Sequence, residues 1–374
     1  MKTGIYVHVP FCVSKCFYCD FCSYTNKSFT QYVDAVIKEI GLRAPKEKVK
    51  IDTIYFGGGT PTLLDACDTG KILAEIRKRF AVDQNAEITI ECNPASATKE
   101  KIAELVSLGF NRFSVGLQSD DDNILKALNR PHNVQDFVDT VSAIRQFGIK
   151  NISCDIMLEL PYQRVETVNK TLDLIEKMQI PHVSAYALKV ERGTPLAKKI
   201  KCGEITLPDE DFCADMYEVV LSRLKKLDIH RYEVSNFAKK GFECEHNLIY
   251  WRLLDYYGFG PSAHGFINGT RYANVKSLVK YYEKTSSGIK PQIYSKKQTL
   301  DDNIFDYAML AFRLNEGLDT TDFYNQFGIN FETKYPKILI LTKKGFFEKA
   351  DNKIKVTDKY FYMLNEILVE LLFE

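Results

Sequence analysis

The sequence predicts an α/β protein built on a parallel sheet. Short apolar, β-rich segments alternate along the first half of the chain with segments in which apolar residues recur at helical spacing. In such a succession each helix carries the chain back to the same edge of the sheet, so that successive strands lie parallel. Six such units form either an open sheet or a curved, partial barrel. In both arrangements ligands bind at the carboxyl ends of the strands.

Six strands and five intervening helices are expected in order. The β-rich segments are Ile5–Val9, Thr53–Phe56, Glu87–Glu91, Arg112–Val115, Ile152–Met157 and Val183–Leu188. The segments with helical spacing are Thr30–Leu42, Gly70–Phe80, Lys99–Leu108, Val134–Phe147 and Val165–Met178. Each expected helix lies between two expected strands, as parallel pairing requires.

A second region begins after Ile205. Asp209–Leu227 has the pattern of a long amphipathic helix. Near the end of the chain, Gly345–Lys349 and Ile354–Val356 form a turn-separated strand pair beside a helical pattern, which is typical of a winged helix. We therefore expect a smaller, mostly helical, winged-helix-like C-terminal domain, and the expected division is 1–230 for the core, 231–290 for a connecting region and 291–374 for the C-terminal domain.

The composition indicates a large core and no strongly charged surface. The chain has 374 residues, 45% of them hydrophobic, with 50 Lys and Arg against 49 Asp and Glu. This balance gives no reason to expect a nucleic-acid partner. Pro10 and Cys12 interrupt the first apolar segment, and no apolar run approaches the ~18 residues of a spanning helix. We expect a cytoplasmic protein that is not an integral membrane protein and has no disulfides.

Three thiols near the amino terminus are the strongest functional signal. Cys12, Cys16 and Cys19 have the spacing C-x3-C-x2-C and follow the first expected strand. Three thiolates on a [4Fe–4S] cluster leave one iron free to bind a small molecule. Cys22 adds a fourth thiol, so a four-cysteine zinc site and a ferredoxin-type cluster remain alternatives. Zinc sites usually separate two C-x2-C pairs by a dozen or more residues, and ferredoxins use C-x2-C-x2-C-x3-C.

A glycine triplet and several polar strand ends form a second group of candidate residues. Gly57-Gly58-Gly59-Thr60-Pro61 follows the second expected strand and matches neither a dinucleotide loop nor a Walker loop. Such a turn allows close approach of the backbone to a ligand. Glu91, Gln118 and Asp155 lie at or near strand ends, and Arg130 follows the helix expected after Gln118. A cap or a salt bridge is the structural alternative for each, but together they suit a polar ligand at one rim.

These motifs together resemble the oxygen-independent coproporphyrinogen III oxidase family of radical S-adenosylmethionine (SAM) proteins. The resemblance runs over nearly the whole chain, in residues 6–12, 56–62, 116–119, 128–130 and 313–317. It implies a partial (β/α)6 radical SAM barrel, a HemN-type C-terminal domain, and a [4Fe–4S] cluster held by Cys12, Cys16 and Cys19. It also implies a SAM site lined by Tyr6, Tyr18, Gly59, Thr60, Glu91, Gln118, Arg130 and Asp155. One departure is Glu159, where the family usually has glycine, and no catalytic residue is assigned.

Two branches of this family compete. The decarboxylating oxidases have a long extension before the cluster and a C-x-C after it, whereas eleven residues precede Cys12 and Phe21 replaces the second thiol. The heme-chaperone branch carries H-N-x-x-Y-W, which is present here as residues 246–251. The resemblance therefore favours a heme chaperone that delivers heme to apo-hemoproteins, in that branch respiratory proteins at the membrane. The alternative is oxidative decarboxylation of coproporphyrinogen III to protoporphyrinogen IX.

His246 is the candidate axial ligand of the heme iron, with Tyr250 and Trp251 against the porphyrin. The alternative is that this segment packs its aromatic side chains on the barrel. His264, in a glycine-flanked loop, is the weaker candidate.

Overall fold

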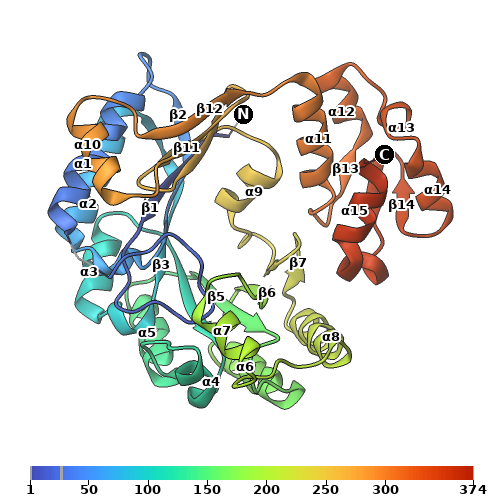
Figure 1. Cartoon of the computed structure of the whole chain (residues 1–374), viewed down its shortest axis with the longest axis horizontal. Coiled ribbons are helices and arrows are strands. Elements are labelled where there is room, and N and C mark those ends of the chain that lie inside the picture. The colour runs from blue at the N-terminus through green and yellow to red at the C-terminus, as the bar shows by residue number, and fades with distance from the viewer. Residues whose placement is uncertain (1, 26–27, 374) are drawn as a thin grey trace.

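The computed structural model describes residues 2–25 and 28–373, and its centre is a sheet of six parallel strands (Figure 1). The strands pair side by side in sequence order. They are β1 (Gly4–Val9), β2 (Lys50–Gly58), β3 (Ala81–Cys92), β4 (Arg112–Gln118), β5 (Asn151–Leu158) and β6 (His182–Ala187). Within the described chain β1 and β6 are flanked by further strands and not by each other, so the predicted partial barrel is confirmed.

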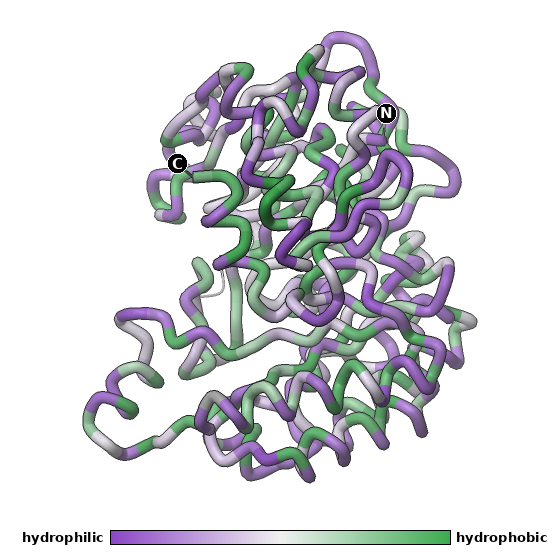
Figure 2. The backbone as a smooth tube through the Cα atoms, turned by 90° about the vertical axis from the view of Figure 1, so that its right-hand side faces the viewer, coloured by the Kyte–Doolittle hydropathy of each residue, from purple (hydrophilic) through white to green (hydrophobic). Residues whose placement is uncertain are grey.

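The helices between these strands cover one side of the sheet and bury a common apolar core with it. The five predicted helices are confirmed to within a few residues as α1 (Phe29–Arg43), α2 (Ala66–Arg79), α3 (Lys99–Ser107), α5 (Val134–Gln146) and α6 (Val165–Lys177). The long amphipathic helix is α8 (Glu210–Lys226), the helix expected between Gln118 and Arg130 is α4 (Asp122–Ala127), and a short unpredicted helix is α7 (Pro195–Lys201). Three 3-10 turns are η1 (Pro61–Leu63), η2 (Pro94–Ser96) and η3 (Asp358–Met363). Along the helices in Figure 2 hydrophobic and hydrophilic stretches alternate, as one-sided burial requires.

Side chains alternate strictly across the parallel strands. In β1, Ile5, Val7 and Val9 are fully buried under the helices, whereas Tyr6 and His8 point to the other side. We call this other side the inner face. Its polar positions continue across the sheet as Thr53 and Tyr55 of β2, Glu87, Thr89 and Glu91 of β3, Arg112 and Ser114 of β4, Ser153 and Asp155 of β5, and His182, Ser184 and Tyr186 of β6. Parallel strands are usually apolar on both faces, so a polar inner face indicates a surface that receives ligands or other polar segments.

Short strands extend the sheet at both edges. Beyond β1 lie β9 (Tyr256–Phe259), which is parallel to it, and then β10 (His264–Ile267), β11 (Thr270–Asn274) and β12 (Gln292–Lys297). Beyond β6 lie β8 (Asn236–Ala238) and β7 (His230–Arg231). Two further helices are α9 (Glu245–Trp251) and α10 (Leu278–Ser286). The predicted boundaries at 230 and 290 stay predictions.

A buried carboxylate fastens the β9–β11 extension to α1. Glu39 is fully buried, and one of its oxygens accepts bonds from Arg43 and Asn274, both at 2.7 Å. The other oxygen accepts from the amide of Gly260 at 2.9 Å and from the Tyr281 hydroxyl at 2.6 Å. Four donors, from α1, β11, α10 and the segment after β9, thus satisfy one carboxylate. Without it the Gly260 amide and the Tyr281 hydroxyl would lack an acceptor, whereas Arg43 and Asn274 would each keep another.

The C-terminal domain has its own apolar core. It consists of α11 (Leu300–Ala311), β13 (Leu318–Asp319), α12 (Thr320–Phe327), α13 (Phe331–Lys334), α14 (Lys337–Lys343), β14 (Phe347–Ala350), β15 (Lys353–Val356) and α15 (Leu364–Leu372). The predicted strand pair near the end of the chain is the antiparallel β14–β15 pair. Arg231 joins this domain to the sheet: its guanidinium lies 3.6 Å from the centre of the Phe361 ring and pairs with Asp358 at 2.6 Å.

None of the helices within residues 2–25 and 28–373 is both long and apolar enough to cross a bilayer.

Replacing Glu39 by alanine should lower the free energy of unfolding by about 3–5 kcal/mol, because the buried Arg43 charge would lose its ion pair and the Gly260 amide and Tyr281 hydroxyl would lose their acceptor. Urea denaturation of the full chain measures the difference. Glu370→Ala is the matched control: its pair with Lys344 is half-exposed on both sides, so its loss should cost less than about 1 kcal/mol. Equal effects of the two substitutions would contradict the anchoring role of Glu39.

Candidate functional site

Residues 10–24, which we call the cysteine loop, are held at both ends by backbone hydrogen bonds. The amide of Cys12 donates to the carbonyl of Tyr24 at 3.0 Å, and the amide of Tyr24 donates to Pro10 at 2.7 Å. The amide of Phe17 donates to the carbonyl of Leu128, at the end of α4, at 3.0 Å. The loop therefore rests on the carboxyl ends of the strands and on the segment after β4, where ligands of a parallel sheet are expected.

The three predicted cluster thiols lie close enough to affect one another. Burial, and to a smaller extent the neighbouring thiol of Cys16, raises the pKa of both Cys12 and Cys19. Arg130 reaches the same place, with its Nη1 3.6 Å from the sulfur of Cys16. No three His, Cys, Asp or Glu side chains in the described ranges surround a single point as one metal ion requires. In an iron–sulfur cluster each thiolate binds its own iron, so the thiolates need not converge on one point.

Cys22 lies in different surroundings from these three thiols. Its sulfur is 3.7 Å from the carbonyl oxygen of Lys276 and 3.9 Å from the hydroxyl of Tyr24. Its own carbonyl accepts a hydrogen bond from the Nε2 of His8 at 3.1 Å if that nitrogen is protonated. The side chain thus faces the segment between β11 and α10.

The glycine triplet joins β2 to the cysteine loop. The amide of Gly59 donates to the carbonyl of Val9 at 2.8 Å, and the amide of Thr60 donates to that of Phe11 at 2.7 Å. A Cβ atom at Gly59 would lie 2.5 Å from the Phe11 oxygen, so only glycine allows these two segments to approach so closely. The hydroxyl of Thr60 also contacts the sulfur of Cys12, at 3.8 Å.

Glu91 ends β3 on the inner face, half-exposed. Its carboxylate accepts bonds from the hydroxyl of Tyr55 and from the amide of Gly58, both at 2.9 Å. Burial, and then the negative charge of Asp155, raises the pKa of Glu91 to about 7, although the two hydrogen bonds act in the opposite direction. The carboxyl group therefore changes its charge near neutral pH.

The ends of β4 and β5 bring three more predicted residues to this rim. Asp155 accepts from the hydroxyl of Ser114 at 3.1 Å, and burial raises the pKa of Asp155. Gln118 has a φ of 70°, at a point where the pairing of β4 with β5 shifts register. Strained backbone of this kind concentrates at functional sites. Arg130 donates to the carbonyl of Gly116 at 3.1 Å, while its buried Nε has no hydrogen-bond partner in the described structure.

Tyr6 and Tyr18 approach the same rim from β1 and from the cysteine loop. The hydroxyl of Tyr6 lies 3.0 Å from the Nδ1 of His8. Burial raises the pKa of Tyr18, although the nearby charge of Arg130 acts in the opposite direction. Of the eight residues predicted for SAM, the structure places Tyr6 and Asp155 midway along β1 and β5 and the other six at or beyond the carboxyl ends of the strands. Their role stays a prediction.

The turn after β5 shows why the family usually has glycine at the position that Glu159 occupies here. Glu159 has a φ of 64°, a conformation that glycine adopts without strain. The side chain of Gln163 holds the turn, accepting from the Leu160 amide at 3.1 Å and donating to the Met157 carbonyl at 2.9 Å.

His246 lies on α9, toward the amino ends of the strands, with its ring 6.4 Å from that of Tyr6. It is 1% exposed, with Nδ1 2.8 Å from the hydroxyl of Thr53 and Nε2 2.7 Å from that of Tyr250. Its ring stacks on Tyr55, with 5.1 Å between centroids. Burial, and then the charge of Arg112, lowers the pKa of His246 to about 3. Both ring nitrogens are therefore occupied, and an axial bond to iron would require one hydrogen bond to break.

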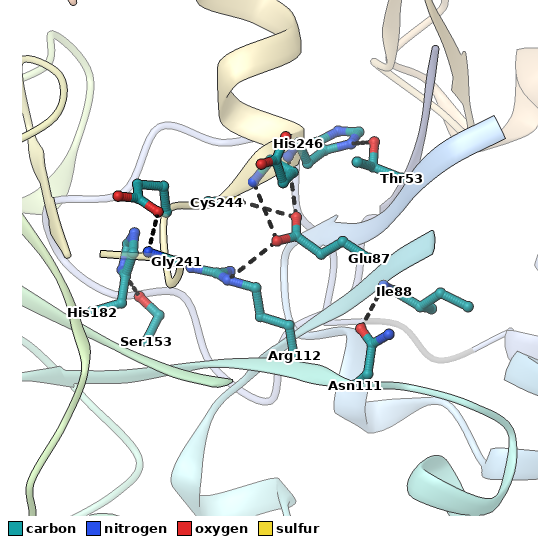
Figure 3. A network of polar contacts seen from close by, with 12 residues as sticks. Thr53, Glu87, Ile88, Asn111, Arg112, Ser153, His182, Gly241, Cys244 and His246 are labelled. Carbon is teal, nitrogen blue, oxygen red and sulfur yellow. Dashed lines mark hydrogen bonds and ion pairs between the residues drawn. The ribbon is translucent and has the colours of Figure 1, made fainter. Parts of the chain in front are cut away.

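A polar network that the sequence did not predict holds α9 in place (Figure 3). Glu87 of β3 accepts from the amides of Glu245 and His246, at 3.2 and 3.1 Å. Arg112 of β4 is 2% exposed, and its Nε lies 3.9 Å from Glu87. Further members are Cys244, whose sulfur lies 3.6 Å from Glu87, and His182, which contacts Ser153 and Tyr232. The available signal was the polar residue at every second position of a strand, which marks the inner face.

Comparison with known proteins agrees with this geometry. The Radical SAM superfamily matches residues 6–175, and the HemN C-terminal domain matches residues 298–359. The heme chaperone HemW of Lactococcus lactis is 33% identical over 99% of this chain and 97% of its own length, and that of Bacillus subtilis is 32% identical over 98% of both. A mitochondrial radical SAM domain-containing protein 1 of Danio rerio is 36% identical over 85% of this chain and 74% of its own.

Among solved structures, the coproporphyrinogen III oxidase HemN of Escherichia coli has a TM-score of 0.87 over 100% of this chain and 90% of its own, at 23% identity. This likeness establishes the fold. The sequence similarity extends through both cores, and the predicted resemblance is confirmed: the chain belongs to the heme chaperone HemW family of the radical SAM superfamily.

Proposed function

We propose that this protein is a cytoplasmic heme chaperone that holds a [4Fe–4S] cluster, SAM and heme, and delivers the heme to apo-hemoproteins. The observation that carries the proposal is the similarity over 99% of the chain to a protein named a heme chaperone. Respiratory hemoproteins at the membrane are the proposed recipients. Heme is the cargo in this proposal, whereas the cluster and SAM are resident cofactors.

The cysteine loop has the donors that a cluster with one open iron requires. Cys12, Cys16 and Cys19 are half-buried thiols without disulfide partners, and Cys22 faces away toward Lys276. When bound, such a cluster would hold SAM through its fourth iron and supply electrons to it. Arg130 beside Cys16 places a positive charge next to the sulfur ligands, which favours the more negative, reduced form of a cluster.

The residues around the loop suit the polar groups of SAM. The Gly59 turn leaves room for a ligand against the backbone, and the Nε of Arg130 is a buried donor that lacks an acceptor. A SAM carboxylate would satisfy that donor. The carboxylates of Glu91 and Asp155 can accept hydrogen bonds from ribose hydroxyls or from the amino group and attract the sulfonium charge.

Serine substitutions test the cluster assignment. Cys12→Ser, Cys16→Ser and Cys19→Ser should each remove the visible absorbance of the anaerobically reconstituted protein and most of its iron and sulfide, because each thiolate binds its own iron. Cys22→Ser should retain about four iron atoms per chain. Cys67→Ser, at an exposed cysteine elsewhere, is the matched control. Loss of the cluster in Cys22→Ser would contradict the three-ligand assignment.

The affinity for SAM should rise by about tenfold between pH 6 and pH 8 as Glu91, with its pKa raised to about 7, becomes ionised. The affinity rises with pH because only the ionised carboxylate attracts the sulfonium and accepts hydrogen bonds from both ribose hydroxyls of SAM. Equilibrium dialysis of the cluster-loaded protein measures it. Glu91→Gln should bind SAM more weakly and with a flatter pH profile, since its amide does not titrate. An unchanged profile in this variant would exclude Glu91 as the titrating group.

An anaerobic assay separates the chaperone from the alternative enzyme. With SAM, a reductant and coproporphyrinogen III, the reconstituted protein should form no protoporphyrinogen IX, while Escherichia coli HemN serves as the positive control. The heme-loaded protein should transfer heme to an apocytochrome, followed by the absorbance of the holocytochrome. Formation of protoporphyrinogen IX would favour the oxidase and contradict the proposal.

A further inference from the structure

The six histidines of the chain differ sharply in what their rings contact. Five of them are hydrogen-bonded: His8 to Tyr6 and Cys22, His132 to Leu117, His182 to Ser153 and Tyr232, His230 to Asp228, and His246 to Thr53 and Tyr250. His230 and His264 are exposed, and of the six only the His264 side chain forms no hydrogen bond with a described residue. A neutral imidazole with a free nitrogen is the commonest metal ligand in proteins.

His264 begins β10 on the same side of the sheet as the rim. Gly258 of β9 pairs with Tyr6, and a Cβ atom on Gly258 would lie 1.8 Å from the carbonyl oxygen of His264. The backbone of His264 therefore covers the inner side of Gly258, next to Tyr6. Burial lowers the pKa of His8, and the nearby His264 contributes a smaller effect in the same direction.

The surroundings of His264 combine an aromatic side chain with positive charges. The ring of Tyr294, 43% exposed, lies edge-on to His264 with 6.4 Å between centroids. The charges of Arg271 and Lys276 are near enough to lower the pKa of His264, although burial contributes more. This shift favours the neutral imidazole, the form that binds iron. Lys276 is exposed, and Arg271 pairs with Asp306 at 2.7 Å.

Heme presents three kinds of group: an iron that takes an axial nitrogen, a flat apolar ring and two propionate carboxylates. The imidazole of His264, the ring of Tyr294 and the cationic side chains of Arg271 and Lys276 match these groups in kind. His246 offers the first only after losing a hydrogen bond inside the barrel, where it is 1% exposed.

We propose that His264, rather than His246, is the axial ligand of the heme iron, with Tyr294 against the porphyrin and Arg271 and Lys276 opposite the propionates. The inference rests on the proposed heme-carrying function and deepens it by naming the site. The heme would lie on the inner side of the β9–β12 extension, beside the rim that carries Tyr6.

The test is titration of the anaerobically reconstituted full chain with ferric heme, followed by its Soret and visible bands. His264→Ala should weaken binding by about tenfold or more, which corresponds to about 1.4 kcal/mol, and should lose the spectrum of an imidazole-ligated iron. Because the side chain is exposed, this variant should fold normally. His230→Ala is the matched control, since it removes an exposed imidazole at the opposite edge of the sheet. Added imidazole should restore the wild-type spectrum in His264→Ala only.

Each other outcome has a distinct meaning. Wild-type affinity and spectrum in His264→Ala would overturn the assignment and leave the chaperone proposal intact, particularly if His246→Phe then lost the spectrum. A loss in His264→Ala that imidazole does not restore would show a role other than ligation and would also overturn the assignment. Failure of the wild-type protein to bind heme would overturn both this inference and the proposed function.

Discussion

The alternation of side chains across six parallel strands is the constraint on which the rest of the structure depends. One side must be apolar because α1, α2, α3, α5 and α6 cover it. The other side carries carboxylates, hydroxyls and cationic groups that the interior cannot leave without partners. The two ends of the inner face meet this requirement differently. At the amino ends, Glu87 and Arg112 are closed off by α9. At the carboxyl ends, Glu91 and Asp155 stay partly exposed. Among the described residues, a buried guanidinium Nε is left without a hydrogen-bond partner at each end, in Arg112 and in Arg130.

This difference changes how the H-N-x-x-Y-W segment is understood. Its histidine is held between Thr53 and Tyr250, and the helix that carries it is fixed through amides bonded to Glu87. The H-N-x-x-Y-W segment therefore contributes to the structure of the barrel, because α9 closes it at the amino ends of the strands. The residues free to meet a ligand lie on strands that the motif supports, where Tyr256 packs edge-on to Tyr250 at 4.6 Å.

Much of the fold could be predicted because the evidence for it is local. Each parallel strand is an apolar, β-rich segment followed by a helix, and helices have caps such as Asn133 before α5. The spacing of the cysteines is visible in the sequence itself. The parts of the fold that were not predicted depend on contacts between residues that are distant in the sequence. β7 to β11 are two to five residues long, and β8 and β9, which join them to the parallel strands, pair with β6 and β1 far away in the sequence. For the same reason the sequence did not predict the surroundings of His246, which come from β2 and β3. Nor did it predict that the side chain of His264 forms no hydrogen bond with any described residue. Glu159 could be recognised as a departure, but its φ of 64° could not.

The position of β1 has a consequence for how the chain reaches its native state. Gly4 pairs with Thr53 on one side and with Tyr256 on the other, so the first strand to be made is a central strand of the finished sheet. About 250 residues separate it from its second neighbour, which at ribosomal elongation rates corresponds to roughly ten to fifty seconds. During that interval one edge of β1 has no partner, and closing so long a loop slows the final step of folding. The nascent cysteine loop is attached to this unpaired strand, so the rim that it forms is completed only after β9 has joined.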